Sequence, residues 1–314
     1  MKTALIMGIT GSFGRHVAQA LAGQGWTIRV LIRNPENLPT QFSGARVFKG
    51  DVADIDSIRA AAQGAHLIVY AVNPCYSQWA TTVLPWIDNA ATVAEEFRMT
   101  MVFPGNVYIF NPVDGPEFDE NTRARPLTGK GKLRQAMEER LQQATQRGAR
   151  VIIVRAGDFI AAGAKSAWMQ SLIKRTKQGY ALSAPSERSL IHSWAYLPDL
   201  ARTVAALVAQ QGALPPFSVF HFRGYRLSFD DLAQAIRTAT GQPVVLKAFP
   251  WWLLRLVTPF STFVRSLFEM RYLWKHELNL LDKKLRAVLK QPIAHTPVAQ
   301  ALLESGLVAI DPAR

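Results

Sequence analysis

Short apolar runs alternate with amphipathic stretches along the first half of the chain. Apolar runs predict strands, and apolar residues spaced three or four positions apart predict helices. Strands are expected at residues 2–7, 27–32, 46–48, 67–72, 100–103 and 151–154, and helices at 13–21, 55–62, 79–97 and 133–145. Continuous apolar runs such as Val151-Ile152-Ile153-Val154 are typical of strands buried on both faces. The pattern predicts an α/β fold with a doubly wound parallel sheet.

A glycine-rich turn follows the first expected strand directly. It reads Gly8-Ile9-Thr10-Gly11-Ser12-Phe13-Gly14 and leads into the first expected helix. Gly8 permits a tight turn, Gly11 lets the backbone approach a phosphate, and Gly14 lets helix and strand pack closely. The helix start adds free N–H groups and the positive end of its dipole. This context predicts a dinucleotide site of the Rossmann type; the alternative is a glycine-rich turn without a ligand.

The alternation changes after about residue 157. Helices are expected at 168–177, 198–209 and 228–240, a strand at 217–222, and a largely helical, apolar segment from Pro250 onward. Ser228 and Asp231 can cap the third of these helices. The expected organisation is a nucleotide-binding domain over residues 1–156. Residues 157–314 are then a smaller substrate or lid region, with some segments returning to the sheet.

The composition of the chain limits the class of protein to which it can belong. The 314 residues are 49% apolar, enough for one large domain or two unequal ones. The single cysteine, Cys75, excludes an internal disulfide and fits a reducing compartment such as the cytoplasm. The chain starts on a strand, so no signal peptide is expected. The most apolar stretch, 248–267, is interrupted by two arginines and two prolines, so no membrane-spanning helix is expected.

The chain is basic, with a formal net charge of +13. Such a balance favours anionic ligands, nucleic acid or anionic membrane surfaces. Lysine and arginine are dispersed without a basic and aromatic nucleic-acid module, so we interpret the charge as a solvated surface that also suits a phosphorylated cofactor. The histidines and the cysteine lack the spacing of metal ligands, and no metal is expected.

Further segments follow the ends of other expected elements. They are Gly50-Asp51-Val52, Ala71-Val72-Asn73, Arg155-Ala156-Gly157-Asp158 and Tyr196-Leu197-Pro198-Asp199. Together with the glycine turn they resemble the short-chain dehydrogenase/reductase superfamily. The resemblance covers nearly the whole chain and is closest to the extended and atypical branches, which include epimerase/dehydratase-like, isoflavone-reductase-like and NmrA-like proteins. It implies a nicotinamide cofactor near the first two of these segments, and a small organic or sugar-derived substrate.

Arg33 bears on the choice of cofactor. The second expected strand ends Leu31-Ile32-Arg33-Asn34, without the Asp or Glu that commonly binds the ribose 2′-OH of NAD. A guanidinium at this position can pair with a 2′-phosphate through forked, charge-assisted hydrogen bonds. The sequence therefore predicts NADP rather than NAD; the alternative is a solvent-facing arginine.

The catalytic positions depart from the pattern that the resemblance implies, a Tyr followed four residues later by a Lys, with a Ser upstream. Thr128 stands at the tyrosine position and Lys132 at the lysine position. An alkyl hydroxyl has a far higher pKa than a phenol, so Thr128 cannot replace the tyrosine near neutral pH. The upstream strand lacks the serine, although its Asn106 can donate a hydrogen bond to a substrate oxygen.

Two residues can replace the missing acid or base. Lys132, with Arg134 and Glu138 after it, is similar to the lysine helix of isoflavone-reductase-like proteins, where lysine is the implied acid/base; its alternative is cofactor ribose binding without proton transfer. Tyr108, at the end of the fifth strand, can reach the site from another direction, or is a half-buried aromatic in a turn. Asp158 either faces the substrate or bonds backbone groups. His192 is expected to be structural, on an edge strand.

The segment from Trp251 to Met270 concentrates large apolar side chains, with Trp251 and Trp252 adjacent. Four interpretations stay open: a lid over an apolar part of the substrate, a dimer interface, interfacial contact with a membrane, and core packing.

Two functions follow from the whole sequence. One is an NADPH-dependent oxidoreductase or epimerase-like enzyme. The other is a non-catalytic NADP-binding sensor or regulator whose partner docks on the later region; loss of the tyrosine favours it, whereas the retained lysine favours the enzyme.

Overall fold

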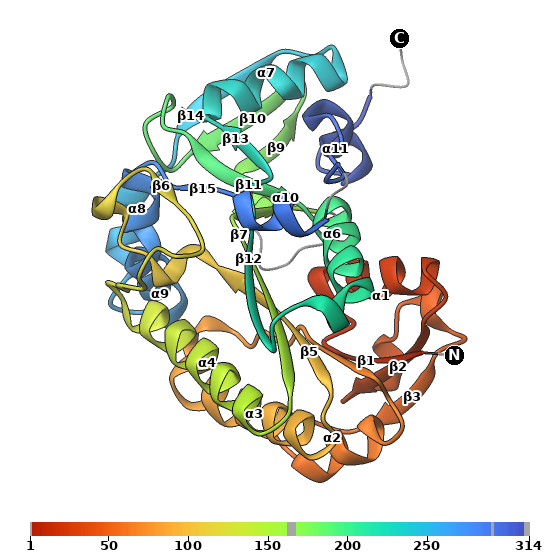
Figure 1. Cartoon of the computed structure of the whole chain (residues 1–314). Coiled ribbons are helices and arrows are strands. Elements are labelled where there is room, and N and C mark those ends of the chain that lie inside the picture. Colours follow the sequence, from red (N-terminus) through yellow and green to blue (C-terminus); the bar gives the residue numbers. More distant parts are fainter. Residues whose placement is uncertain (1, 162–167, 290–291, 311–314) are drawn as a thin grey trace.

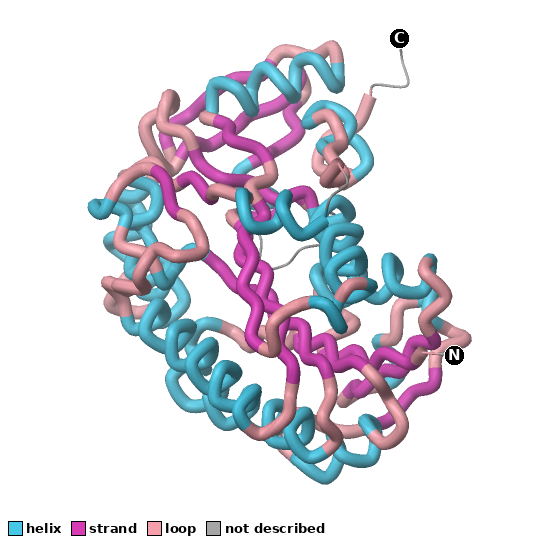
Figure 2. Tube along the Cα trace, viewed as in Figure 1, coloured by secondary structure: helices cyan, strands magenta, loops and turns pink. Residues whose placement is uncertain are grey.

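The computed structural model describes residues 2–161, 168–289 and 292–310. A parallel sheet runs through its centre (Figures 1 and 2) and has seven strands. The strand order is β12-β7-β5-β4-β1-β2-β3, and every neighbouring pair is parallel. The strands are β1 (Thr3–Met7), β2 (Thr27–Ile32), β3 (Arg46–Lys49), β4 (Leu67–Tyr70), β5 (Thr100–Asn106), β7 (Arg150–Ala156) and β12 (Phe217–Phe222). The predicted α/β class and doubly wound sheet are confirmed.

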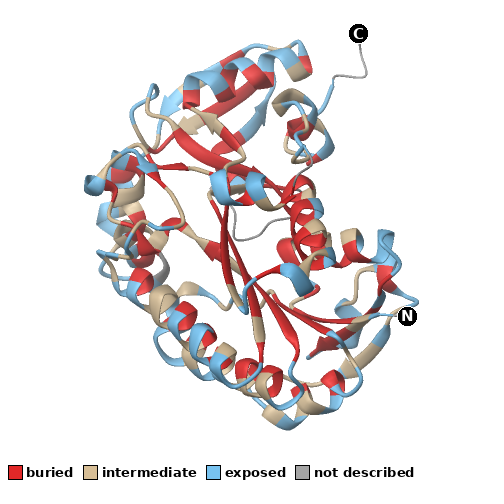
Figure 3. Ribbon diagram, viewed as in Figure 1, coloured by how far each residue is buried: buried red, intermediate tan, exposed pale blue. Residues whose placement is uncertain are grey.

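Helices cover both faces of this sheet because successive strand residues point in opposite directions. Ala4 and Ile6 of β1 face a core that contains side chains of α1 (Ser12–Gly23), α6 (Leu197–Ala209) and α10 (Lys283–Leu289). Leu5 and Met7 face a second core with α2 (Ile55–Ala62), α3 (Trp79–Glu96) and α4 (Gly129–Gln146). The central strands are buried almost throughout (Figure 3), which explains their continuous apolar runs.

The later region carries two small sheets and a core of its own. One sheet has the order β14-β10-β9 and the other the order β13-β11-β8. Their strands are β8 (Asp158–Ile160), β9 (Ile173–Thr176), β10 (Gly179–Ala184), β11 (His192–Tyr196), β13 (Tyr225–Leu227) and β14 (Val244–Ala248). The helices are α5 (Trp168–Leu172), α7 (Phe229–Thr240), α8 (Trp251–Val257), α9 (Thr262–Met270) and α11 (Val298–Glu304), and β6 (Glu117–Phe118) pairs with β15 (Asn279–Leu280). The domain boundary near residue 156 stays a prediction, although β12 does join the central sheet.

Three expectations for individual elements are corrected. The helix expected at 168–177 ends at Leu172, because β-branched residues of β9 pair with β10 across a turn at Gly179, whose φ is +132°. His192 lies on β11, the middle strand of its sheet rather than an edge strand. Helix α4 begins at Gly129 instead of residue 133, because the Thr128 side chain accepts a hydrogen bond from Gly131 N and caps it. The expected cap of α7 by Ser228 and Asp231 is confirmed.

Candidate functional site

The glycine turn has a geometry that only glycine fits. Gly8 has a φ of +92°, and a Cβ built on it would lie 2.5 Å from the Ala71 carbonyl oxygen. A Cβ on Gly14 would lie 2.4 Å from the Gly8 carbonyl oxygen. Gly11 N donates to that same oxygen at 3.0 Å and closes the turn. The turn is therefore tight, and α1 packs directly against it.

The start of α1 is open to an anion. Gly11 is the N-cap and provides no side-chain cap, and the first turn contains no acidic residue. The N-cap side chain thus takes up none of the N–H groups of the first turn, while Thr10 and Gly11 are exposed and Ser12 is half-buried. Peptide N–H groups converging at a positive helix end suit a diphosphate. These residues fit the pyrophosphate of a dinucleotide cofactor.

The neighbouring strand ends bring the other predicted cofactor residues to the same edge of the sheet. Arg33 follows β2 and Asp51 follows β3, and Arg33 Nε lies 3.9 Å from Asp51 Oδ2. The Arg33 side chain is 76% exposed, so its guanidinium is available to a ligand. Val52 is buried and its carbonyl accepts from Asn89 at 3.0 Å.

The end of β4 is held beside the glycine turn. Ala71 N donates to Met7 O at 2.8 Å. Ala71 and Val72 are half-buried, and Asn73 is exposed. All the cofactor residues predicted from the glycine turn and from β2, β3 and β4 thus lie along one edge of the sheet. Their contact with a cofactor stays a prediction.

A group of polar side chains adjoins that edge, and we call it the tyrosine cluster. It consists of Tyr76, Tyr108, Lys130, Asp158 and Glu269, from five separate segments. The hydroxyls of Tyr76 and Tyr108 are 2.8 Å apart and hydrogen-bonded. Lys130, at the start of α4, forms an ion pair with Glu269 of α9, and its Nζ lies 5.4 Å from the centre of the Tyr76 ring. The cluster combines hydroxyl, ammonium and carboxyl groups at the carboxyl ends of β5 and β7.

Burial sets the protonation of these groups. Burial raises the pKa of Asp158 to about 7, so its carboxyl gains and loses a proton near neutral pH. Burial also raises the pKa of Tyr76, and raises that of Tyr108 well above its usual range; the nearby Asp158 carboxylate adds to both shifts. Both phenols therefore stay protonated at neutral pH. Within the cluster, Asp158 is the group whose pKa suits a general acid or base.

An aromatic contact links the glycine turn to β8, the strand that also carries Asp158. The rings of Phe13, in the turn, and Phe159, next to Asp158, stack with centroids 6.5 Å apart. Tyr76 comes only five residues after Ala71, the residue that lies under Gly8. The chain segment that leaves the glycine turn's neighbour Ala71 thus leads directly to the tyrosine cluster.

Helix α4 presents a different set of residues than the sequence suggested. Lys130, Arg134, Met137 and Leu141 follow the four- and three-residue spacing of one helix face. Lys130 is 5% exposed, and Arg134 donates to Pro104 O at 3.2 Å and packs over Trp79. Lys132, two residues after Lys130, is exposed. The signal that identifies Lys130 is its spacing from the apolar residues of the helix rather than its place in the motif.

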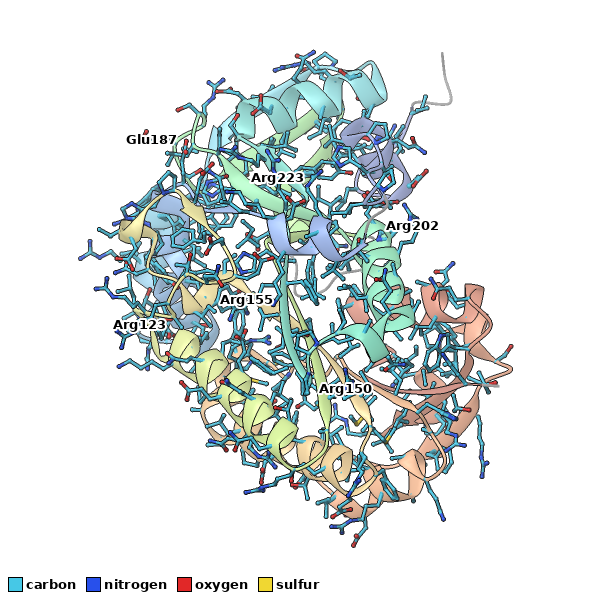
Figure 4. The ribbon with its side chains drawn as sticks, in the orientation of Figure 1. Arg123, Arg150, Arg155, Glu187, Arg202 and Arg223 are labelled. Carbon is cyan, nitrogen blue, oxygen red and sulfur yellow. The ribbon has the colours of Figure 1, made fainter. Side chains whose placement is uncertain are left out.

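Asn106 and Arg155, also singled out from the sequence, make structural contacts near the site. Asn106 Oδ1 accepts from Tyr108 N at 3.0 Å and shapes the turn after β5. Arg155, at the end of β7 (Figure 4), donates to the two carboxylate oxygens of Glu138 at 2.6 and 3.2 Å, and its Nη1 lies 3.3 Å from His221 Nε2. This buried pair fixes α4 against the end of the sheet, next to Asp158.

Neither a metal-binding cluster nor a membrane-spanning helix is present among the residues that the structure describes. No group of three or more His, Cys, Asp or Glu side chains in this part of the chain is arranged to hold a metal ion. None of the helices described is both long and apolar enough to cross a membrane.

Part of the chain matches a known protein family, and nearly the whole chain resembles solved structures. Residues 1–84 match the model of the NmrA-like family, and a search of curated proteins finds no match. Solved epimerases resemble nearly the whole chain. UDP-N-acetylglucosamine 4-epimerase from Bacillus cereus is 14% identical with a TM-score of 0.74, covering 98% of this chain and 96% of its own. UDP-glucose 4-epimerase from Brucella ovis, in complex with NAD, is 14% identical with a TM-score of 0.72 and 97% coverage of both chains.

A third structure, the enzyme WbmH from Bordetella bronchiseptica in complex with NAD+, is 16% identical with a TM-score of 0.70 and 96% coverage of both chains. At these identities the likeness is one of fold. The predicted resemblance to the extended and atypical short-chain dehydrogenases/reductases is confirmed. The chain thus has the fold of these epimerases, and its first 84 residues match the NmrA-like family.

Proposed function

We propose that this protein is an NADP(H)-dependent oxidoreductase that acts on a carbonyl or hydroxyl group of a small organic or sugar-derived substrate. One observation carries the proposal. The uncapped glycine turn and the tyrosine cluster both lie at the edge of the central sheet where its parallel strands end. A nucleotide site and a proton-exchanging site side by side are what hydride transfer to or from a carbonyl carbon requires.

The proposed cofactor contacts use the residues at the strand ends. NADP(H) supplies or accepts a hydride when bound. The first turn of α1 binds the pyrophosphate, and Arg33 binds the 2′-phosphate that distinguishes NADP from NAD. The two solved structures described as complexes contain NAD, so the preference for NADP rests on Arg33. Lys132 is exposed on α4, which suits contact with the cofactor ribose better than proton transfer.

The proposed proton chemistry uses the tyrosine cluster in place of Thr128. The protonated Tyr108 hydroxyl donates a hydrogen bond to the substrate oxygen and orients it. Asp158 holds the proton that this oxygen gains on reduction, and takes it back on oxidation, because its pKa is about 7. Lys130 supplies positive charge that stabilises a developing oxyanion. These roles need neither the tyrosine nor the serine that the sequence lacks.

One observation favours the second candidate, a non-catalytic NADP-binding sensor or regulator. The Tyr76 and Tyr108 hydroxyls bond each other, and Lys130 is paired with Glu269. The cluster thus satisfies much of its own hydrogen bonding without a ligand. A sensor needs only the cofactor site and a surface for its partner. Location in the cytoplasm, which the single exposed Cys75 suits, and a homodimeric state are common to both candidates.

The test separates binding from turnover. Calorimetry with NADPH and NADH measures the cofactor preference, and a panel of carbonyl and activated-alkene substrates is followed by loss of NADPH absorbance. We expect tight NADPH binding and turnover of some substrate, with a rate that falls about 10²–10⁴-fold in Asp158→Asn. The control is Glu36→Gln, which removes an exposed carboxyl that is not part of the cluster. NADPH binding without turnover across the panel would favour the sensor.

A further inference from the structure

Helix α8 and the turn after it expose a continuous set of large apolar side chains, which we call the apolar ridge. Trp252, Leu256 and Phe260 are spaced four residues apart and are 72%, 66% and 89% exposed. Leu253 and Val257, one position further along, are also exposed. Single exposed apolar residues are ordinary, but five from one short segment are a marker of an interaction surface.

The ridge stands on a rigid base. Trp251, the neighbour of Trp252, points inward, and its Nε1 donates to Pro185 O at 2.9 Å. Its ring packs 5.3 Å from Phe268 and lies under the Arg271 guanidinium at 4.9 Å. Core packing therefore accounts for the first tryptophan of the pair. It does not account for the second, whose side chain projects from the surface.

The stretch of sequence that contains the ridge, between Asp231 and Glu269, is basic. Residues 232–268 contain Arg237, Lys247, Arg255 and Arg265 and no Asp or Glu. Arg255 is exposed on α8 itself. Arg265 is also exposed, and it donates to Pro259 O at 3.5 Å, next to Phe260. The whole chain carries a formal net charge of +13.

We propose that the apolar ridge docks on an anionic lipid surface. Its Trp, Leu and Phe side chains would enter the boundary between headgroups and acyl chains, and the arginines beside them would contact lipid phosphates. A second copy of the chain fits this surface less well, because pairing two ridges would bring the exposed arginines of both together. Helix α8 has seven residues, so it lies along the surface without crossing it.

Vesicle flotation tests the proposal with two lipid compositions: phosphatidylcholine alone, and phosphatidylcholine mixed with phosphatidylglycerol. The parent protein is expected to float with the anionic vesicles and to be released by high salt. Replacing Trp252 and Phe260 together with Ser should lower the partition coefficient at least roughly tenfold. The matched control is Ile310→Ser, because Ile310 is 63% exposed and follows α11, on the opposite side of the molecule from α8 (Figure 1).

Charge reversal tests the electrostatic half of the proposal. Arg255→Glu with Arg265→Glu should weaken flotation with the anionic vesicles, whereas Lys283→Glu on α10, the control, should have a much smaller effect. Circular dichroism melting shows whether each variant is folded. Light scattering measures the oligomeric state without lipid. Absence of flotation by the folded parent, or flotation that the Ser variant retains, would overturn the proposal. A parent dimer that the Ser variant dissociates would assign the ridge to a second copy instead.

Discussion

Replacing Asp158 with Asn should make the protein more stable and less active, and the gain in stability should depend on pH. Burial raises the pKa of this carboxyl from its ordinary 3.8 to about 7. The folded state then binds a proton more tightly than the unfolded state between those two values. Stability contributed by the carboxyl is therefore lost as the pH rises from about 4 to about 7, and is constant above that range. The neutral amide of Asn has no such dependence.

The size of the effect follows from the shift. A difference of about three pKa units corresponds to about 4 kcal/mol at 1.36 kcal/mol per unit. This is a ceiling, because the Asp158 side chain keeps partial solvent contact and the charged form relaxes its surroundings. We expect Asp158→Asn to exceed the parent by roughly 2–4 kcal/mol in free energy of unfolding at about pH 8, and to match it at about pH 4.

Urea denaturation of both proteins at several pH values measures this difference directly, with Glu36→Gln as the control for removing an exposed carboxyl. Hydride transfer measured on the same samples should fall about 10²–10⁴-fold, because the carboxyl that lowers the stability of the folded protein is also the proposed acid or base. A stability difference that does not change with pH would refute the reasoning, since it would mean that the folded protein does not disfavour the charged carboxyl. A less stable variant above about pH 7 would refute it too.

Three further predictions concern the cofactor, the basic residue of the site and the apolar segment. Arg33→Ala should lower NADPH affinity by about 1.5–3 kcal/mol while leaving NADH affinity nearly unchanged; equal binding of both cofactors by the parent, measured calorimetrically, would contradict it. Lys130→Met should reduce the rate of hydride transfer by about 10²–10³ and Lys132→Met by less, after correction for cofactor affinity; the reverse order would restore Lys132 as the acting lysine. Trp251→Ala should destabilise the fold by about 3–5 kcal/mol and Trp252→Ala by less than about 0.5 kcal/mol, and thermal melts showing similar losses would place both in the core.

The central sheet was predictable because its pattern is local. Strands such as β1, β4 and β7 carry continuous apolar runs, and the glycine turn has the spacing that a tight strand-to-helix connection requires. The short strands of the later region were not predictable, since two or three residues such as those of β8 or β15 show no period. Their pairing depends on segments far away in the chain.

The candidate site was likewise predictable from the sequence only in part. The sequence places Tyr108 and Asp158 at strand ends, but nothing local shows that they share a site with Tyr76. Lys130 was missed because the motif directed attention to Lys132, two positions later. Two residues along a helix are about 200° apart around its axis, so this difference separates the buried face from the exposed one.

The place of β12 in the central sheet also has a consequence for how the protein is made. β12 completes the sheet beside β7, yet it follows β7 by about sixty residues of the later region. During synthesis β7 therefore has an open, strongly apolar edge until Phe217–Phe222 has emerged, and the core on the α1 side lacks α6 until Leu197–Ala209 has emerged. A fragment ending at residue 156 would retain that edge permanently and is expected to aggregate. The nucleotide-binding part and the later region should accordingly unfold in one cooperative transition, with the chain passing through its most vulnerable state just before β12 is added.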